Sequence, residues 1–257
     1  MLASSRWIQP FSCGEPSGSA WGKQPAAQVL CFPHAGGSAA FFRPFKDHLP
    51  RGYGVAGVQY PGRQDRLREP FVTTVEELAD QIALQLRPPA DVPLVLFGHS
   101  MGAVVAFEVA RRLEAGRPTG LLGLVVSGRR APSTVRHEAV HRAGDRALIA
   151  EVTGLGGTEE RLFEDEELMR LVVPVLRNDY RAIETYRANQ DLLARTPVLC
   201  LRGDRDPKVD ADEAAAWARH TAAGCAVEEF PGGHFFLNER RPEVGRSIER
   251  FTRPLTR

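Results

Sequence analysis

The chain of 257 residues has few cysteines and almost no lysine. Its four cysteines are widely spaced and form no Cys-x-x-Cys pair, which argues against a zinc site or a dithiol redox motif. Cys31 and Cys200 lie in apolar, strand-like stretches, so we expect them to be buried free thiols in a reducing compartment. No metal site is expected.

An excess of charge and a long apolar run are also lacking. Lysine and arginine number 33 against 32 acidic residues, a net charge of +1, which excludes a basic surface built for nucleic acid or a membrane. No stretch approaches the roughly 20 apolar residues that cross a bilayer. The first residues carry no signal-peptide core, so we expect a cytoplasmic protein without membrane or nucleic-acid partners.

Short apolar runs alternate along the chain with amphipathic segments. Continuous apolar strands separated by helices are typical of a parallel sheet covered on both faces, so the pattern predicts an α/β fold. The predicted strands are 29–32, 53–60, 94–97, 121–127, 198–201 and 226–230; the predicted helices are 40–48, 75–86, a segment after Gly102, and 242–251; residues 12–24 are predicted to be a loop.

One segment, 129–193, has no convincing strand and interrupts this alternation. A short helix is predicted from Asp145 to about Gly154, with Asp145 as its cap. A longer apolar stripe begins near Asp165, and Pro174 within it should kink or break that helix. We expect core residues 1–128 and 194–257 to flank a helical lid at 129–193. The alternative is a packed subdomain that does not control substrate access.

The stretch "VLFGHSMGAVVAFEVA" places Gly98, Ser100 and Gly102 between a strand and a helix. Gly-x-Ser-x-Gly in this context is typical of a nucleophile elbow, a tight turn that exposes the serine beside a helix N-terminus. The glycines would let strand and helix approach closely. The alternative is a glycine-rich turn with an ordinary exposed serine, because chance matches to this pentapeptide are common.

A catalytic serine needs a base, and His234 is the best candidate among seven histidines. It follows the last predicted strand and the flexible Pro231-Gly-Gly233 turn. His34 and His99 lie in tight loops and are expected to shape them. The remaining four, which sit in polar helix-like contexts, are expected at the surface: His48, His137, His141 and His220.

The orienting acid is expected after another strand and before the histidine. "LRGDRDPKVD" offers Asp206, which Pro207 fixes in place, with Asp204 as its rival. The order Ser100, Asp206, His234 is the order of an α/β-hydrolase. The residue after the nucleophile, Met101, supplies one oxyanion-hole N–H in that fold, and the Gly-rich "PHAGGS" loop is suited to supply the other.

Five blocks of the chain resemble the stand-alone, type II thioesterases of polyketide and nonribosomal peptide assembly lines. They are "LCFPHAGGSAAFFRPF", "VQYPGRQDRLREP", "LFGHSMGAVVAFEVAR", "LRGDRDPKV" and "FPGGHFFL". The resemblance implies an α/β-hydrolase fold, the triad Ser100, Asp206 and His234, and an oxyanion hole formed by the N–H groups of Ala35 and Met101. Chain-terminating relatives usually carry the acid where this chain has Ser127, which favours the editing type.

The resemblance also implies a substrate and partners. The substrate would be an acyl thioester on the phosphopantetheine arm of an acyl or peptidyl carrier protein, with no cofactor of the enzyme's own. The chain is expected to be a monomer, because no long apolar face is left unassigned. Four residues are possible linings of the passage, although plain core packing is preferred for each: Phe41, Phe42, Phe71 and Met169.

Two further alternatives stay open at this stage. Arg63 and Arg66 can meet the phosphate of the arm, although a loop salt bridge with Asp65 or Glu69 is preferred. The enzyme can also be an esterase for small oxygen esters, since a triad does not choose the leaving group. A non-catalytic scaffold is disfavoured because all three triad members and both oxyanion loops are present.

Overall fold

The computed structural model describes residues 5–11, 26–86, 93–116, 120–157, 165–188 and 192–256, which include a seven-stranded sheet in the order β1-β3-β2-β4-β5-β6-β7. Neighbouring strands are parallel except for the antiparallel pair β1 and β3. The strands are β1 Ile8–Phe11, β2 Ala27–Phe32, β3 Tyr53–Val58, β4 Leu94–His99, β5 Leu121–Ser127, β6 Val198–Gly203 and β7 Cys225–Phe230.

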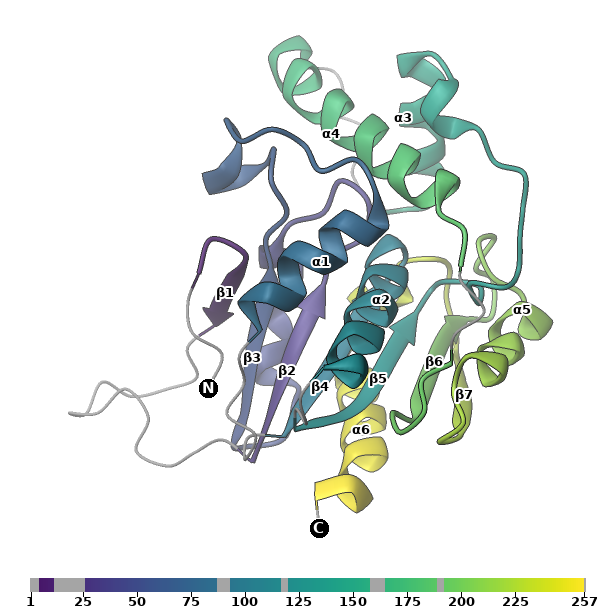
Figure 1. Cartoon of the computed structure of the whole chain (residues 1–257). Coiled ribbons are helices and arrows are strands. Elements are labelled where there is room, and N and C mark those ends of the chain that lie inside the picture. The colour runs from purple at the N-terminus through teal and green to yellow at the C-terminus, as the bar shows by residue number, and fades with distance from the viewer. Residues whose placement is uncertain are drawn as a thin grey trace.

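Helices cover both faces of this sheet, with α1 and α2 on one face and α6 on the other (Figure 1). The α-helices are α1 Val75–Gln85, α2 Met101–Ala115, α3 Asp145–Gly154, α4 Glu166–Thr185, α5 Ala211–Ala215 and α6 Arg241–Thr252. The 3-10 helices are η1 Ala39–Asp47, η2 Gln64–Arg66, η3 Val140–Arg142, η5 Ala216–His220, η6 Phe236–Asn238 and η7 Arg253–Thr256.

Successive strand residues enter opposite cores, as the two-residue period of a strand requires. Leu30 and Leu96 join the core beneath α1 and α2, whereas Val29 and Val95 join the one beneath η1 and α6. Both layers are fully buried, which explains why these strands read as uninterrupted apolar runs. The predicted fold class is confirmed.

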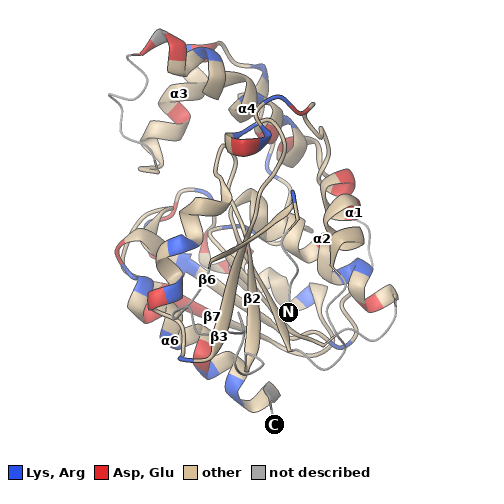
Figure 2. Cartoon of the chain, turned by 90° about the vertical axis from the view of Figure 1, so that its left-hand side faces the viewer, with Lys and Arg blue, Asp and Glu red and all other residues tan. Residues whose placement is uncertain are grey.

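The segment between β5 and β6 contributes no strand to the sheet within its described residues; it forms η3, α3 and α4. Asp165 caps α4, because its carboxylate accepts the N–H groups of Glu167 at 2.8 Å and Leu168 at 3.1 Å. The helix continues through Pro174, so a break there is a wrong prediction. Helices α3 and α4 stand above the carboxyl ends of the parallel strands (Figures 1 and 2).

Sequence and structure differ in a few elements. Strand β1 was missed; its position at the sheet edge tolerates Pro10, which cannot donate to a ladder. The segment predicted as a helix at 40–48 is the 3-10 helix η1, which contains Pro44. Gly144, not Asp145, precedes the first residue of α3 as its cap. The loop predicted at 12–24 lies outside the described residues.

The prediction of buried free thiols is confirmed for the two cysteines it named. Cys31 and Cys200 are buried free thiols, and burial raises the pKa of each. Cys225 is a half-buried free thiol, and Cys13 lies outside the described residues. In the described part of the chain, no three His, Cys, Asp or Glu side chains are grouped to hold a metal, and no helix has the length and apolarity to span a bilayer.

Candidate active site

Ser100 occupies the tight turn between β4 and α2 in a strained backbone conformation. Its φ is 54° and its ψ is −119°, a region that side-chain-bearing residues rarely adopt. The Ser100 N–H donates to the carbonyl of Ser127 at 2.8 Å, which ties the turn to the neighbouring strand β5. The strain and the strand-to-helix position are those expected of a nucleophile elbow.

The two glycines of this turn are needed for close approach of backbones. A Cβ added to Gly98 would lie 2.2 Å from the Gly102 carbonyl oxygen. A Cβ added to Gly102 would lie 2.0 Å from the carbonyl oxygen of Phe32, at the end of β2. Both obstacles are main chain, so no side-chain rotation relieves them.

Gly102→Ala is therefore expected to destabilise the fold by about 3 kcal/mol, because β2 and α2 must separate to admit the methyl group. Gly154→Ala, in α3, is the matched control: its added Cβ meets nothing within 4 Å and should leave stability equal or slightly higher. Urea unfolding of both variants measures the difference. Equal midpoints would show that the elbow has room to relax.

His234 and Asp206 form a buried hydrogen-bonded pair at the carboxyl ends of β7 and β6. His234 Nδ1 lies 3.0 Å from each carboxylate oxygen of Asp206. The two side chains are 1% and 0% exposed. One of these oxygens also accepts the N–H of Lys208 at 2.8 Å, which fixes the carboxylate. A histidine held this way has its other ring nitrogen available for proton transfer.

Asp204, the rival acid, has a different role. Its carboxylate accepts the N–H of Gly232 at 2.8 Å, and this bond is the main reason that its pKa is lowered. It thereby ties the loop that carries His234 to the end of β6. The geometry favours Asp206 over Asp204 as the orienting acid.

Ser100 and His234 line one cavity of about 510 Å³ beneath α3 and α4. Ala35 and Gly36, which follow β2, lie at the same wall. The remaining lining is largely apolar and comes mostly from the two helices: Val152, Leu155, Val172, Leu176, Tyr180, His34 and Phe235. The four possible linings named from sequence, Phe41, Phe42, Phe71 and Met169, are not among them; Phe42 is core, as preferred, and Phe71 packs against Gly62.

Two backbone N–H groups at this site have no hydrogen-bond acceptor among the described residues. Neither the Ala35 nor the Met101 N–H donates to another described residue, which leaves both for an oxyanion. The next N–H along the loop, that of Gly36, is already used: it donates to Asp179 of α4 at 2.8 Å. A carboxylate from the helical segment thus holds the glycine-rich loop of the core.

Arg63 completes this connection and corrects an expectation. Its guanidinium donates to the two oxygens of Asp179 at 2.6 and 2.8 Å and to the Gly37 carbonyl at 3.2 Å. The Arg63 and Asp179 side chains are 7% and 1% exposed. Arg63 therefore pairs with neither Asp65 nor Glu69, and burial keeps it from a phosphate.

Arg66 behaves as the sequence suggested. It donates to Glu69 at 2.6 and 3.1 Å, while its guanidinium stacks 4.1 Å over the ring of Trp7. Asp65 accepts from Gln9 instead. The preferred loop salt bridge is thus confirmed for Arg66, and this arginine is also committed within the fold.

His99 packs against His234, and His34 packs against His99, both as neutral rings. His99 is fully buried with Nδ1 3.2 Å from Ser127 Oγ, and its ring centroid is 5.0 Å from that of His234. Burial, reinforced by the charges of His234 and His34, lowers the pKa of His99 well below 6.5. Burial, with His234 and Arg63, lowers the pKa of His34 to about 3.

Protonation of His99 is expected to destabilise the protein in acid. Because its pKa is lower in the folded than in the unfolded chain, its stabilising effect is complete above pH 6.5 and is lost as the pH falls toward the folded value. In that window the free energy of unfolding should drop by about 1.4 kcal/mol per pH unit from this group.

Urea unfolding at pH 7, 6 and 5 checks this expectation in His99→Asn. The variant should show a shallower pH slope than the wild type, whatever its absolute stability. His137→Asn, at an exposed histidine, is the control and should keep the wild-type slope. A wild-type slope in His99→Asn would contradict the assignment.

The other histidines lie away from the cavity, but not all are at the surface. His220 is 5% exposed: it packs beside Trp217 and Phe107, and its Nε2 lies 2.9 Å from Ser133 Oγ. The prediction that it is a surface residue is wrong, because η5 turns it into the core beneath α2. His141 is bound by Glu184 of α4.

The fold and the site together define an α/β-hydrolase with a serine-centred site: a mostly parallel sheet in which β4, β6 and β7 bring Ser100, Asp206 and His234 to the same edge. Residues 27–252 match the model of the Thioesterase domain family. The chain belongs to this thioesterase family and is a thioester hydrolase.

Individual relatives agree with this membership. The chain is 46% identical to thioesterase PikA5 of Streptomyces venezuelae over 95% of its own length and 85% of that protein. Its structure resembles that of the type II thioesterase BorB from the borrelidin biosynthetic cluster, with a TM-score of 0.84, 43% identity and coverage of 97% and 99% of the two chains. YbtT, a type II thioesterase of the yersiniabactin pathway, gives a TM-score of 0.86 at 28% identity, with coverage of 98% and 100%.

Proposed function

We propose that this thioesterase hydrolyses acyl groups from the phosphopantetheine arm of acyl or peptidyl carrier proteins, and so removes stalled or aberrant units from a polyketide or nonribosomal peptide assembly line. The observation that carries the proposal is that the strained Ser100 shares one cavity with His234, whose ring is held from behind by the buried Asp206. The relatives named as type II thioesterases of such pathways support the substrate class.

In this mechanism His234 removes the proton from Ser100, whose oxygen attacks the thioester carbonyl. The oxyanion receives the N–H groups of Ala35 and Met101, and the α2 N-terminus adds its positive end. The arm's thiol leaves with the proton from His234. Water, activated by His234, then hydrolyses the acyl-serine, while Asp206 stabilises the charged ring. Hydrolysis needs only water, so no cofactor is expected.

Helices α3 and α4 would act as the lid over this cavity. They supply most of its apolar wall, which suits an acyl chain and limits entry of bulk water. The arm would enter beside α4. The enzyme would work as a cytoplasmic monomer that docks weakly on its carrier protein.

Hydrolysis of a short acyl group from a loaded carrier protein, followed by intact mass, tests the function beside a matched nitrophenyl ester. Loss of the acyl group with wild type, and its retention with Ser100→Ala, is the expected result. Cleavage of the nitrophenyl ester alone would contradict the proposal and assign the enzyme to small oxygen esters.

A further inference from the structure

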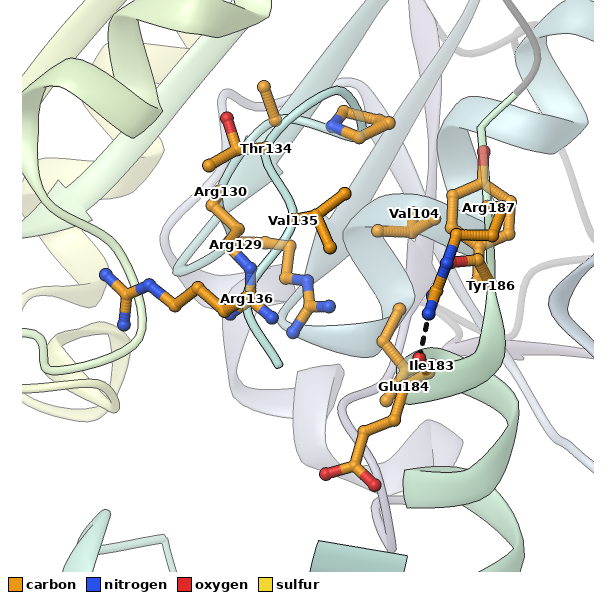
Figure 3. A pocket seen from close by; sticks show the side chains of 12 residues that line it. Val104, Arg129, Arg130, Thr134, Val135, Arg136, Ile183, Glu184, Tyr186 and Arg187 are labelled. Atoms are coloured by element: carbon orange, nitrogen blue, oxygen red, sulfur yellow. Dashed lines mark hydrogen bonds between the residues drawn. The ribbon is translucent and has the colours of Figure 1, made fainter. Parts of the chain in front are cut away.

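A second pocket, rich in arginine, lies beyond the active-site cavity. It opens between the segment that follows β5 and the end of α4, and encloses about 390 Å³ of space open to solvent. Arg129, Arg130 and Arg136 line it from the first segment, and Arg187 lines it from the second (Figure 3). We call it the arginine pocket.

Two of these four arginines already have acidic partners. Arg130 is bound by Glu138, and Arg136 donates to both oxygens of Glu213 at 2.6 and 2.7 Å. Their charges are therefore largely neutralised within the fold. Arg130 is only 4% exposed, and one of its terminal nitrogens, Nη1, is buried without a hydrogen-bond partner. A buried donor left unpaired is costly unless a ligand or water completes it.

The other two arginines have no carboxylate partner among the residues that the structure describes. Arg187 donates to the carbonyls of Glu184 and Tyr186, at 2.9 and 2.7 Å, and Arg129 makes no side-chain ion pair. Burial, followed by the charge of Arg130, lowers the pKa of Arg129 to about 10, so it remains a cation at neutral pH. The charges of Glu138 and Glu184 favour its charged form, but neither carboxylate hydrogen-bonds to it within the described part of the chain, so its guanidinium can still bind an anionic ligand.

The acid that lines the pocket, Glu184, offsets these charges only in part, because its carboxylate is hydrogen-bonded elsewhere. Glu184 accepts the N–H groups of Val140 and His141 at 2.9 and 3.1 Å and binds the His141 ring. Its side chain is 2% exposed, so it is directed into the protein rather than toward solvent. The arginine pocket thus keeps excess positive charge.

The arginine pocket follows the active-site cavity along the same two elements. On one face of α4, Leu176 and Tyr180 line the cavity, and Ile183 and Glu184 line the arginine pocket. The eight-residue step from Leu176 to Glu184 covers about 12 Å of helix. At the end of β5, a Cβ on Gly128 would lie 3.3 Å from the His234 ring, and Arg129 is the next residue.

Apolar residues also line the arginine pocket. Val104, Val135 and Ile183 contribute to the wall of the arginine pocket. An extended phosphopantetheine arm has matching chemistry: a phosphate at one end, a branched apolar pantoate next to it, and the thioester at the far end. Guanidinium groups are suited to phosphate oxygens, which they bind through paired N–H donors.

We propose that the arginine pocket binds the phosphate of the phosphopantetheine arm, with Arg129 and Arg187 as its ligands. This inference rests on the proposed function, because it names where that substrate's charged end is held. It also replaces Arg63 and Arg66, which the fold commits to Asp179 and Glu69.

Two small substrates with the same acyl group test the proposal: an acyl-pantetheine and an acyl-4′-phosphopantetheine. The wild type should show a kcat/KM about tenfold higher for the phosphorylated one, a preference that added salt weakens. Arg129→Gln and Arg187→Gln should each remove most of this preference, mainly through KM, and leave acyl-pantetheine hydrolysis unchanged. Neither substitution leaves a carboxylate unpaired, so both variants should fold.

Arg51→Gln is the matched control, because it removes one positive charge from an exposed turn at the opposite edge of the sheet, before β3. It should keep the full preference. The proposal is overturned if the wild type does not distinguish the two substrates, or if Arg129→Gln and Arg187→Gln retain the preference. Failure of the wild type to cleave either thioester would instead overturn the proposed function.

Discussion

Asp206→Asn is expected to lower kcat by about 10⁴-fold, because an amide cannot stabilise the charged imidazolium or hold the required tautomer of His234. The loss should appear in kcat more than in KM, since Asp206 is not among the residues that line the cavity. Acyl-carrier hydrolysis under saturating substrate measures it. The His234 ring and the Lys208 N–H surround this carboxylate, so the fold should persist.

Asp204→Asn is the matched control for this result. The two aspartates are two residues apart, but Asp204 accepts the Gly232 N–H, which an asparagine oxygen can also do, and otherwise pairs only with the exposed Arg205 among the described residues. Its kcat should stay within about threefold of wild type. The assignment of the acid would be wrong if Asp204→Asn were the inactive variant and Asp206→Asn the active one.

Asp179→Ala is expected to destabilise the protein by about 3–5 kcal/mol, because it leaves the buried Arg63 guanidinium without its carboxylate. It also removes the acceptor of the Gly36 N–H, so the loop that carries Ala35 loses its anchor on α4. We therefore expect kcat to fall about 10- to 100-fold with little change in KM. Urea unfolding and steady-state kinetics on the loaded carrier measure the two effects.

Two further variants separate stability from positioning. Asp145→Asn breaks an ion pair with Arg177 at 2.6 Å, but Asp145 is 65% exposed, so its loss should cost about 1 kcal/mol or less. The double variant Arg63→Met with Asp179→Leu removes both buried charges and should recover much of the stability. The kcat of the double variant should stay low, because the Gly36 N–H still lacks its acceptor. Full activity in the double variant would show that the bond to Gly36 does not position the oxyanion loop.

The coupling between Asp179 and Gly36 links the helical segment to the catalytic edge of the sheet. The same helix, α4, contributes the wall of the active-site cavity and part of the arginine pocket. Movement of α4 would therefore change the substrate passage and the oxyanion loop together. A lid of this kind would affect catalysis through the Asp179 carboxylate as well as by covering the active-site cavity.

Most of the elements could be predicted from the sequence because their signals are local. Strand β5 has the predicted bounds, and α1 and α4 begin as predicted, since Thr74 and Asp165 cap them. Strand β1 was missed because four residues with an internal proline give too short a pattern, and its partner β3 lies more than 40 residues away.

Local sequence signals also mark part of the candidate site. Ser100 and His234 are each marked by glycine-containing turns after strands, and parallel strands bring their carboxyl ends to one edge. The cavity lining was not predictable: an apolar side chain such as Phe42 has the same sequence signature whether it fills a core or faces a passage.

The sequence by itself determined the alternation of strands and helices, the strained elbow and the order of serine, acid and histidine, because periodicity and turn chemistry act over a few residues. Only the tertiary structure decided which of two nearby aspartates meets His234, that Arg63 pairs with Asp179, and that Arg129 and Arg187 meet at one pocket. These choices depend on how distant segments pack, and on which charges remain unpaired once they have done so.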